Sequence, residues 1–273
     1  MNHLLRELAP VTERGWELLE EEAREHLTSA LAARKLVDFS GPHGWRHSAT
    51  NLGRTHDVSG GPVDGVTALG REVLPLVEPR APFGIRRAEL EAAERGAADP
   101  DLRNLDEAAR RIALAENRAV FGGWDEAGLR GITAVTPHEP IALPGDDLRT
   151  CPTHVARAVE VLLQNGIGGP YGLALGPDIY RGVVETTEHG GYPLFEHLRH
   201  ILDGPLVWAP GVDGGVVVSL RGGDFLFDCG QDLAIGYADH DAEWVRLYLV
   251  ESFSFRVATP EAAVALPAAA APQ

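Results

Sequence analysis

A glycine-rich stretch between residues 48 and 78 constrains the fold more than any other feature of this sequence. It reads SATNLGRTHDVSGGPVDGVTALGREVLPLVE, in which short alternating runs flank a Ser-Gly-Gly-Pro turn. This pattern predicts a long two-stranded arm with a glycine-rich tip. An isolated hairpin is only marginally stable in water, and this one has too little side-chain bulk for a core of its own. We therefore expect the arm to lie on something else, such as another subunit.

Helical periodicity recurs along the rest of the chain. Residues 11–36 predict an amphipathic helix with Thr12 as N-cap and an apolar face formed by Trp16, Leu19, Ala23, Leu27, Leu31 and Leu36. A second long helix is expected over 104–121, capped by Asn104 and ended by Gly122 and Gly123. Shorter helices are predicted at 85–95, 150–165, from Pro177 onward and at 194–202.

Strand-like segments fill most of the remainder. The segments 171–176, 206–211 and 214–220 are short and apolar, and the last third of the chain alternates apolar and polar residues. In that region Leu247, Leu249, Glu251, Phe253 and Phe255 share one face of the predicted strands. The sequence thus predicts an α+β fold without an internal repeat, followed by a disordered tail over 267–273.

The charge of the chain limits its partners. The 273 residues carry a net charge of −16, which argues against a protein that coats nucleic acid or binds anionic membranes. The start of the chain, MNHLLRELAP, has no apolar core of the kind a signal peptide needs. No stretch approaches the ~20 apolar residues of a membrane-spanning helix, so a cytosolic protein is expected.

Residues that could carry chemistry are few. Phosphate-loop, dinucleotide-binding and His-Glu-x-x-His motifs are absent from the sequence, and neither Ser219 nor Ser254 lies in a Gly-x-Ser-x-Gly elbow. Cys151 and Cys229 are too few for a disulfide framework, so both are expected to be buried. The densest ionisable patch comprises Glu188, His189, Glu196, His197 and His200. A solvated surface is favoured there over a metal site, and neither a metal nor a catalytic residue is predicted.

Several long motifs resemble those of one protein family. The N-terminal frame is LAP, then Trp16, then ARKLVDFSGPHGW, and the C-terminal block contains GQDLAIGY and ESFSFRV. Between them come AVFGGW, GPYGLALGPDIY and GGYPLFEHL, in the order expected for type 1 encapsulin shell proteins, also described as linocin-type proteins. The resemblance extends from Asn2 to Leu266.

The resemblance implies the HK97-like fold of tailed-phage major capsid proteins. In this chain the peripheral domain would comprise three segments, namely 1–47, 79–135 with the spine helix, and 224–266. The extended loop would be 48–78, and the axial domain 136–223. In that fold the extended loop packs on a neighbouring subunit, which would solve the burial problem of the arm.

The family's function implies two sites. A cargo protein, either a dye-decolourising (DyP-type) peroxidase or a ferritin-like protein, docks a terminal targeting peptide in a groove between the N-terminal helix and the GQDLAIGY strand. The matching residues are Leu27, Leu31, Arg34, Asp38, Leu233, Ile235 and Tyr237, although Leu27 and Leu31 are equally well explained as core. The segment Glu188, His189, Gly190, Gly191 and Tyr192 maps to a loop at a fivefold pore. The chain is expected to form a shell of 60 copies that stores iron or confines oxidative chemistry.

Some family features do not carry over. Lys35 is the only lysine, so the arm cannot form the lysine–asparagine crosslinks of some phage relatives. A tryptophan that stacks a flavin in some members corresponds to Ala88, and no cofactor is predicted. Two alternatives stay open, namely a prophage capsid protein that packages DNA and a secreted bacteriocin or peptidase.

Overall fold

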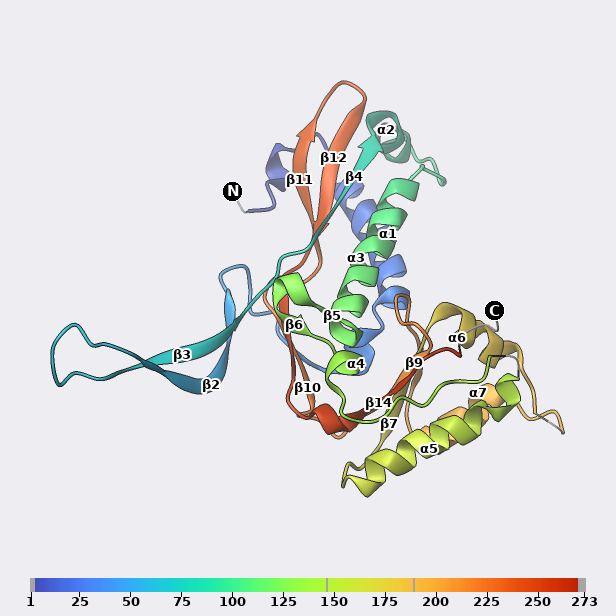
Figure 1. The fold of residues 1–273 in the computed structure, drawn as a ribbon. Coiled ribbons are helices and arrows are strands. Elements are labelled where there is room, and N and C mark those ends of the chain that lie inside the picture. The colour runs from blue at the N-terminus through green and yellow to red at the C-terminus, as the bar shows by residue number, and fades with distance from the viewer. Residues whose placement is uncertain (1–2, 146, 189, 270–273) are drawn as a thin grey trace.

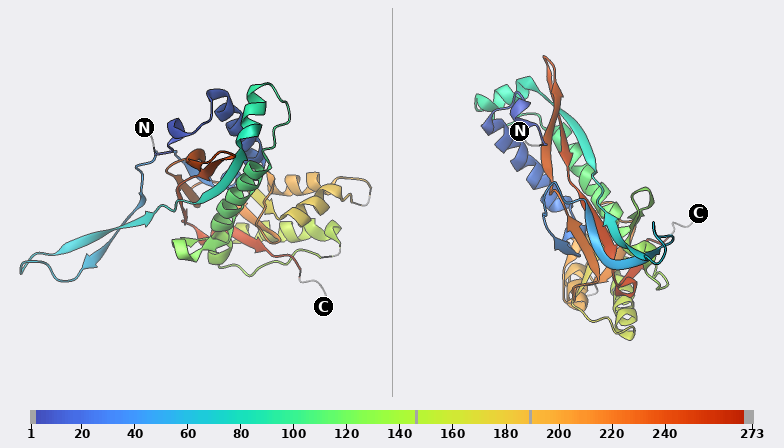
Figure 2. Two further views of the ribbon diagram at one scale, coloured as in Figure 1. Left: turned by 90° about the horizontal axis from the view of Figure 1, so that it is seen from above. Right: turned by 90° about the vertical axis from the view of Figure 1, so that its left-hand side faces the viewer.

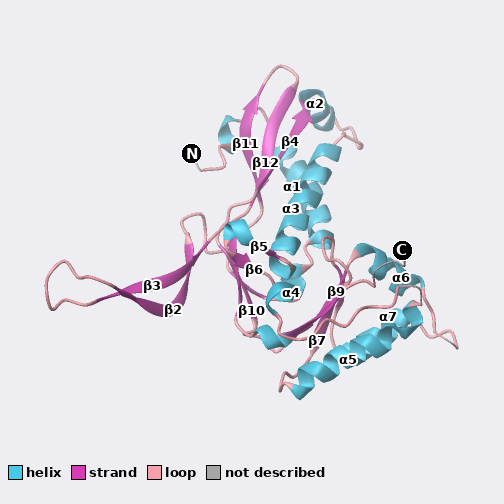
Figure 3. Cartoon of the chain, in the orientation of Figure 1, coloured by secondary structure: helices cyan, strands magenta, loops and turns pink. Residues whose placement is uncertain are grey.

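Two packed lobes and one projecting arm make up the molecule (Figure 1). The computed structural model describes residues 3–145, 147–188 and 190–269. Figure 3 shows that helices and strands mix in both lobes, whereas the arm consists of two strands joined by a loop at its tip. The predicted α+β character is confirmed.

The first lobe combines two long helices with a three-stranded antiparallel sheet. The helices are α1 (Glu13–Ala30) and α3 (Arg103–Phe121), and the sheet has the order β11 (Ala234–His240), β12 (Trp244–Val250) and β4 (Arg80–Arg86). A short helix, α2 (Arg87–Glu94), follows β4 directly. Leu19, Ala23 and Leu27 on α1 share one buried core with α3 and the sheet, because apolar residues recur on one helix face.

The ends of these two helices test the capping predictions. Thr12 is confirmed as the N-cap of α1, where its hydroxyl accepts a hydrogen bond of 3.1 Å from Gly15 N. The α1 helix ends at Ala30, earlier than predicted, and a single 3-10 turn, Ala33–Lys35, follows. Asn104 was wrongly predicted as the cap of α3, since the helix begins one residue earlier and Asn104 donates instead to Gly84 O at 2.8 Å.

The second lobe is built on a four-stranded sheet with the order β14-β9-β7-β8. Helices α5 and α7 pack against this sheet and against each other. The elements of the lobe are α5 (Cys151–Gln164), β7 (Tyr171–Leu175), α6 (Pro177–Glu185), α7 (Leu194–Leu202), β8 (Leu206–Trp208), β9 (Gly215–Ser219) and β14 (Ala263–Leu266). The last strand, β14, therefore joins a sheet whose other strands all lie between residues 171 and 219.

A third sheet connects the lobes. Its order is β1 (Asp38–Ser40), β10 (Phe225–Cys229) and β13 (Phe253–Val257), and small elements β5 (Gly123–Trp124), β6 (Leu129–Arg130) and α4 (Ile132–Val135) lie beside it. The alternation predicted to run through residues 247–255 is interrupted. Ser252 N donates to Gln231 O, and Glu251 turns inward, so β12 and β13 belong to different sheets.

The arm leaves the body as predicted. Strands β2 (Ala49–Val58) and β3 (Ala68–Pro75) pair only with each other and extend well beyond both lobes (Figures 1 and 2). Its exposed apolar side chains are Val58, Val63, Val66, Leu69 and Val73. A ribbon with so much apolar surface in water is expected to be covered by another molecule.

The C-terminal prediction was partly wrong. Leu143 N donates to Pro267 O at 2.8 Å and Ala268 forms a bridge with Leu143, so the chain is ordered at least to that point. Residues 270–273, also predicted to be disordered, lie outside the described residues. Within the described ranges, no helix is both long and apolar enough to traverse a bilayer.

Candidate functional site

A groove of about 400 Å³ runs between α1 and β11. Leu27 and Leu31 from the helix side and Leu233 and Ile235 from the strand side form its apolar part. Arg34 and Asp232 close one end, and further polar lining comes from Glu20, Arg24 and Thr28. The groove thus offers an apolar floor with charged groups at its margins, which suits an extended peptide with alternate apolar side chains.

The groove contains five of the seven residues expected to bind a peptide. Leu27 and Ile235 are 7% and 2% exposed, so they belong to the lobe's core and also form the groove floor. Leu233 is only half-buried and stands at the rim. The other two residues do not line the groove.

Asp38 and Tyr237 lie outside the groove, where the course of the chain and their own hydrogen bonds place them. The turn after α1 sends the chain into β1, where Asp38 Oδ2 accepts from Gly223 N at 2.7 Å. Tyr237 lies further along β11, where its backbone N–H donates to Leu4 O and its hydroxyl contacts His240 Nδ1. The resemblance assigned Asp38 to the N-terminal helix, which was wrong because that residue begins β1. Tyr237 lies on the expected strand but outside the groove.

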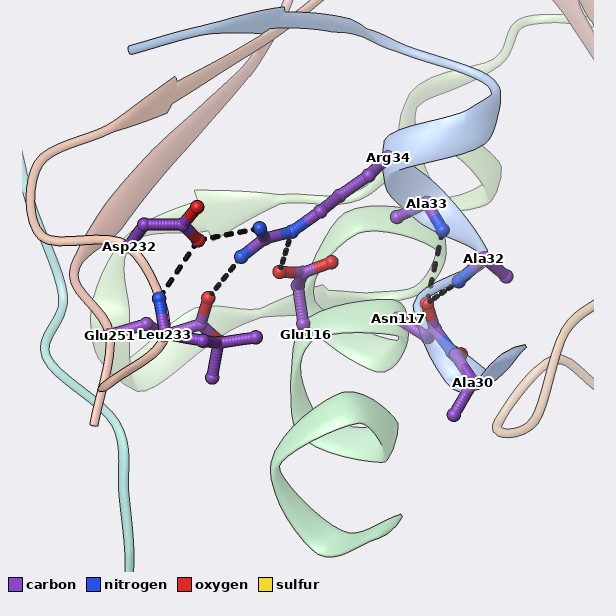
Figure 4. A network of polar contacts seen from close by, with 9 residues as sticks. All are labelled: Ala30, Ala32, Ala33, Arg34, Glu116, Asn117, Asp232, Leu233 and Glu251. Carbon is purple, nitrogen blue, oxygen red and sulfur yellow. Dashed lines mark hydrogen bonds and ion pairs between the residues drawn. The ribbon is translucent and has the colours of Figure 1, made fainter. Parts of the chain in front are cut away.

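Arg34 holds three carboxylates at the end of the groove (Figure 4). Its Nε, Nη1 and Nη2 atoms donate to Glu116, Asp232 and Glu251 respectively, each at 2.7 Å. The Glu116 and Glu251 side chains are fully buried, whereas that of Asp232 is 43% exposed. The planar guanidinium fork suits this task because its donors point in fixed, different directions.

Two buried acids with one buried cation leave an excess of negative charge. Glu116 Oε1 and Glu251 Oε1 have no hydrogen-bond partner among the described residues. Burial raises the pKa of Glu251 well above its ordinary value, and the neighbouring Glu116 raises it further, although Arg34 opposes both effects. Burial also raises the pKa of Glu116. The pair therefore tends to retain a proton that would be lost in water.

This retained proton gives a pH dependence with a defined sign. Stability linked to a raised carboxyl pKa is fully present below the unfolded-state value, near 4.5, and is lost as the pH rises through the folded-state value. Glu251→Gln imitates the protonated acid. The denaturation midpoint of the variant minus that of the natural chain should therefore increase progressively from pH 4.5 upward. A difference that stays constant with pH would contradict the retained proton.

Asn117 fixes the chain where α1 ends, next to the charged network (Figure 4). Its Oδ1 accepts from Ala32 N and Ala33 N, and its Nδ2 donates to Ala30 O and Pro210 O, all between 2.9 and 3.1 Å. The side chain is fully buried. Through these bonds α3 sets the direction of the turn that carries Arg34.

The loop between α6 and α7 projects from the second lobe (Figure 1). Glu188 N donates to Tyr192 O, Gly191 N donates to Glu188 O, and Gly190 and Gly191 adopt φ of +105° and +82°, which favour glycine. Glu188 Oε1 lies 2.7 Å from His197 Nδ1 on α7, and Tyr192 is 52% exposed. The loop is thus a tight polar turn tethered to α7, while His189 lies outside the described residues.

The two serines considered from the sequence make ordinary hydrogen bonds, and the two cysteines are buried. Ser219 donates to Gly168 O, and the hydroxyl of Ser254 bonds that of Thr50. Cys151 and Cys229 are buried, as predicted, and burial raises the pKa of each thiol to about 12. At such pKa values both are protonated and unreactive near neutral pH.

Comparison with known proteins decides the family. The family model described as "Encapsulating protein for peroxidase" matches residues 1–254. The type 1 encapsulin shell protein of Rhodospirillum rubrum is 49% identical over 271 residues, covering 97% of this chain and 96% of that protein. The chain belongs to the encapsulin shell protein family. The Mycobacterium tuberculosis type 1 shell protein is 43% identical to this encapsulin, with 97% of this chain and 99% of that protein covered.

Solved structures of low sequence identity share the fold of this encapsulin. A virus-like particle protein from Pyrococcus furiosus has a TM-score of 0.64 at 16% identity, covering 92% of this chain and 98% of that chain. The capsid protein of phage XM1 has a TM-score of 0.51 at 10% identity, with 85% and 89% covered. The predicted HK97-like fold is confirmed.

A diheme-cytochrome–encapsulin fusion from Kuenenia stuttgartiensis is 21% identical, with 83% of this chain and 63% of that protein covered.

Sequence reasoning named only Arg34 in the charged network of this encapsulin, and it missed Glu116, Asp232 and Glu251. Glu116 and Asn117 lie within an otherwise regular helix, and Glu251 lies within an alternating run. A signal was present, because each places a polar residue on the apolar face of a predicted element. Such positions indicate a buried polar contact, but they do not identify its partner.

Proposed function

We propose that this encapsulin chain assembles in the cytoplasm into a closed icosahedral shell of 60 copies that encloses a cargo protein. The arm over 48–78 is the extended loop, and the lobe built on the β14-β9-β7-β8 sheet forms the axial domain. The single observation that carries the shell proposal is the projecting arm, whose apolar side chains are exposed in the single chain. Closed symmetry would cover every copy's arm with its neighbour.

Cargo binding is assigned to the α1–β11 groove. Its apolar floor can receive side chains of a terminal targeting peptide, while Arg34 and Asp232 mark the polar end. The family description names a peroxidase as the enclosed protein, which supports a DyP-type peroxidase, with a ferritin-like protein as the alternative cargo. Individual sites can be weak, because an oligomeric cargo engages many subunits simultaneously.

The turn Glu188–Tyr192 is assigned to the opening at the fivefold axis. Its polar groups and the contact between Glu188 and His197 provide a hydrophilic edge for small solutes. A net charge of −16 on each copy disfavours DNA as the content, since a DNA container needs a basic inner face.

One co-production experiment tests shell and groove together. The full chain is produced with a monomeric fluorescent protein that carries the terminal segment of a peroxidase or ferritin-like protein from the same genome. We expect hollow spheres by electron microscopy and a mass of about 1.8 MDa, sixty times 29.3 kDa. Leu233→Asp places a charge at the groove rim, where apolar contacts are needed. It should reduce co-eluting fluorescence about tenfold or more, the effect of losing 1.4 kcal/mol of binding.

The control is Leu163→Asp, which changes a leucine that is 58% exposed on α5 in the other lobe. It should leave both particles and fluorescence unchanged. Undiminished fluorescence in the Leu233→Asp particles would remove the groove assignment, whereas small oligomers in place of spheres would remove the shell assignment. Nucleic acid in the purified particles would support the capsid alternative.

A further inference from the structure

A compact group of side chains of the kinds that bind metals lies at the root of the arm, outside the residues that line the groove. His43 and His47 come from the loop between β1 and β2, and Asp228 comes from β10. His43 Nε2 lies 2.8 Å from Asp228 Oδ1, and His47 Nε2 lies 3.0 Å from Asp228 Oδ2. All three ligand atoms lie within 4.8 Å of one another.

The backbone around the two histidines is held firmly in place. His43 N donates to Cys229 O, Gly44 N donates to Gly230 O, and His47 N donates to Gly44 O. Gly44 has a φ of +94°, a conformation that allows the chain to reverse between the two histidines. Both imidazoles are therefore directed at one carboxylate by main-chain contacts.

A row of hydroxyl groups surrounds the same carboxylate. Ser40, Asp228 and Ser254 lie opposite one another on the three neighbouring strands β1, β10 and β13. Thr50 donates to Asp228 Oδ2 and its hydroxyl also bonds Ser254 Oγ at 2.6 Å. Ser40 Oγ lies 3.0 Å from His43 Nε2. Outer groups of this kind orient metal ligands in proteins.

We propose that His43, His47 and Asp228 bind one divalent transition-metal ion per subunit, best matched by Zn²⁺. Two imidazoles and a carboxylate are a donor set that Zn²⁺ accepts, with the fourth position left for water or the Ser40 hydroxyl. In a tetrahedral site with bonds of 2.0–2.1 Å, ligand atoms lie about 3.3 Å apart. The two histidine nitrogens lie 2.8 and 3.0 Å from different oxygens of Asp228, and the three ligand atoms lie within 4.8 Å of one another, so small side-chain rotations would bring them to this spacing.

The site is accessible and its charge is favourable. The side chains of His43 and His47 are 41% and 28% exposed, and that of Asp228 is 15% exposed. Neutral imidazoles with one carboxylate leave a bound dication only partly neutralised, but the strongly acidic chain attracts cations to its surface. A bound ion would fasten β10 to the start of β2, two residues after His47, and would fix the direction in which the arm leaves the body.

Cobalt binding to the assembled, tag-free particle tests this proposal. After chelator treatment, Co²⁺ is titrated in and its visible d–d absorption is recorded, followed by competition with Zn²⁺. We expect one ion per chain, displacement by Zn²⁺, and a melting midpoint that rises when Zn²⁺ is added. His43→Gln, which changes an exposed side chain, should abolish the absorption, and Thr50→Val should weaken affinity about 10- to 100-fold.

The matched control is His26→Gln. His26 lies 3.3 Å from both Glu22 and Asp106, forming a second three-residue cluster that has one imidazole only. Absorption that survives in this variant and disappears in His43→Gln supports the proposal. Absence of absorption in the natural chain, persistence in His43→Gln, or loss in His26→Gln overturns it. X-ray absorption of the Zn²⁺-loaded natural particle gives an independent check, because a site without two imidazoles also overturns it.

Discussion

Replacing Arg34 by methionine is expected to lower the free energy of unfolding by about 3–5 kcal/mol, because it leaves buried carboxylates without their cation. Glu116 and Glu251 each lose a charge-assisted hydrogen bond of 2.7 Å in a site that water does not reach. Arg34→Lys should recover only part of the loss, since one ammonium cannot reproduce the geometry of the fork. The measurement is the guanidinium midpoint at a fixed protein concentration, because assembly adds to apparent stability.

Two comparisons isolate the cause of this loss. Arg24→Met removes an exposed arginine of α1, the helix that precedes the turn with Arg34, and should change the midpoint little. Adding Glu116→Gln and Glu251→Gln to Arg34→Met should restore much of the stability, because neutral amides are less costly to bury than carboxylates. If the triple variant is no more stable than Arg34→Met alone, the loss of stability comes from the lost packing of the arginine side chain and not from uncompensated buried charge.

Asn117→Ala is expected to cost a similar amount, about 3–5 kcal/mol, for a different reason. The substitution leaves two buried N–H groups and at least one buried carbonyl without partners, and each such group costs about 1–3 kcal/mol. The turn that carries Arg34 would also lose its support. We therefore expect weaker peptide binding in the groove in addition to a lower denaturation midpoint.

Asn104→Ala provides the matched control on the same helix. Asn104 is exposed and makes one hydrogen bond, to Gly84 O, so its loss should cost about 1 kcal/mol or less. Equal effects of the two substitutions would show that the Asn117 contacts add nothing beyond an ordinary surface hydrogen bond.

Local patterns were sufficient to predict most elements of the fold. The range 194–202 predicted for α7 coincides with Leu194–Leu202, because a leucine-rich face recurs at helical spacing. The interruption at Glu251 was not predictable from alternation, which continues through it unbroken. It depends on Arg34, a residue 217 positions away, and a local pattern contains no information about such a contact.

The same limit applies to the sites. Resemblance identified the two elements that line the groove, but it assigned Asp38 to a helix that ends before this residue, and Tyr237 lies on β11 outside the groove. His43 and His47 are visible as a pair with a spacing of four, whereas Asp228 enters from β10, 181 positions after His47. Distances of this kind are set by the packing of both lobes and by the strand order of the central sheet.

The position of two late strands has a consequence for synthesis of the subunit. Strand β12 lies between β11 and β4 in one sheet, and β14 pairs with β9 at the edge of another. A ribosome must therefore produce residues up to 250 before the first lobe has its full set of strands, and residues up to 266 before the second lobe does. Until then β4 and β9 present unpaired edges, which are prone to wrong pairing. We expect both lobes to reach their final form together, after release of the chain, so that half-finished subunits do not enter a growing shell.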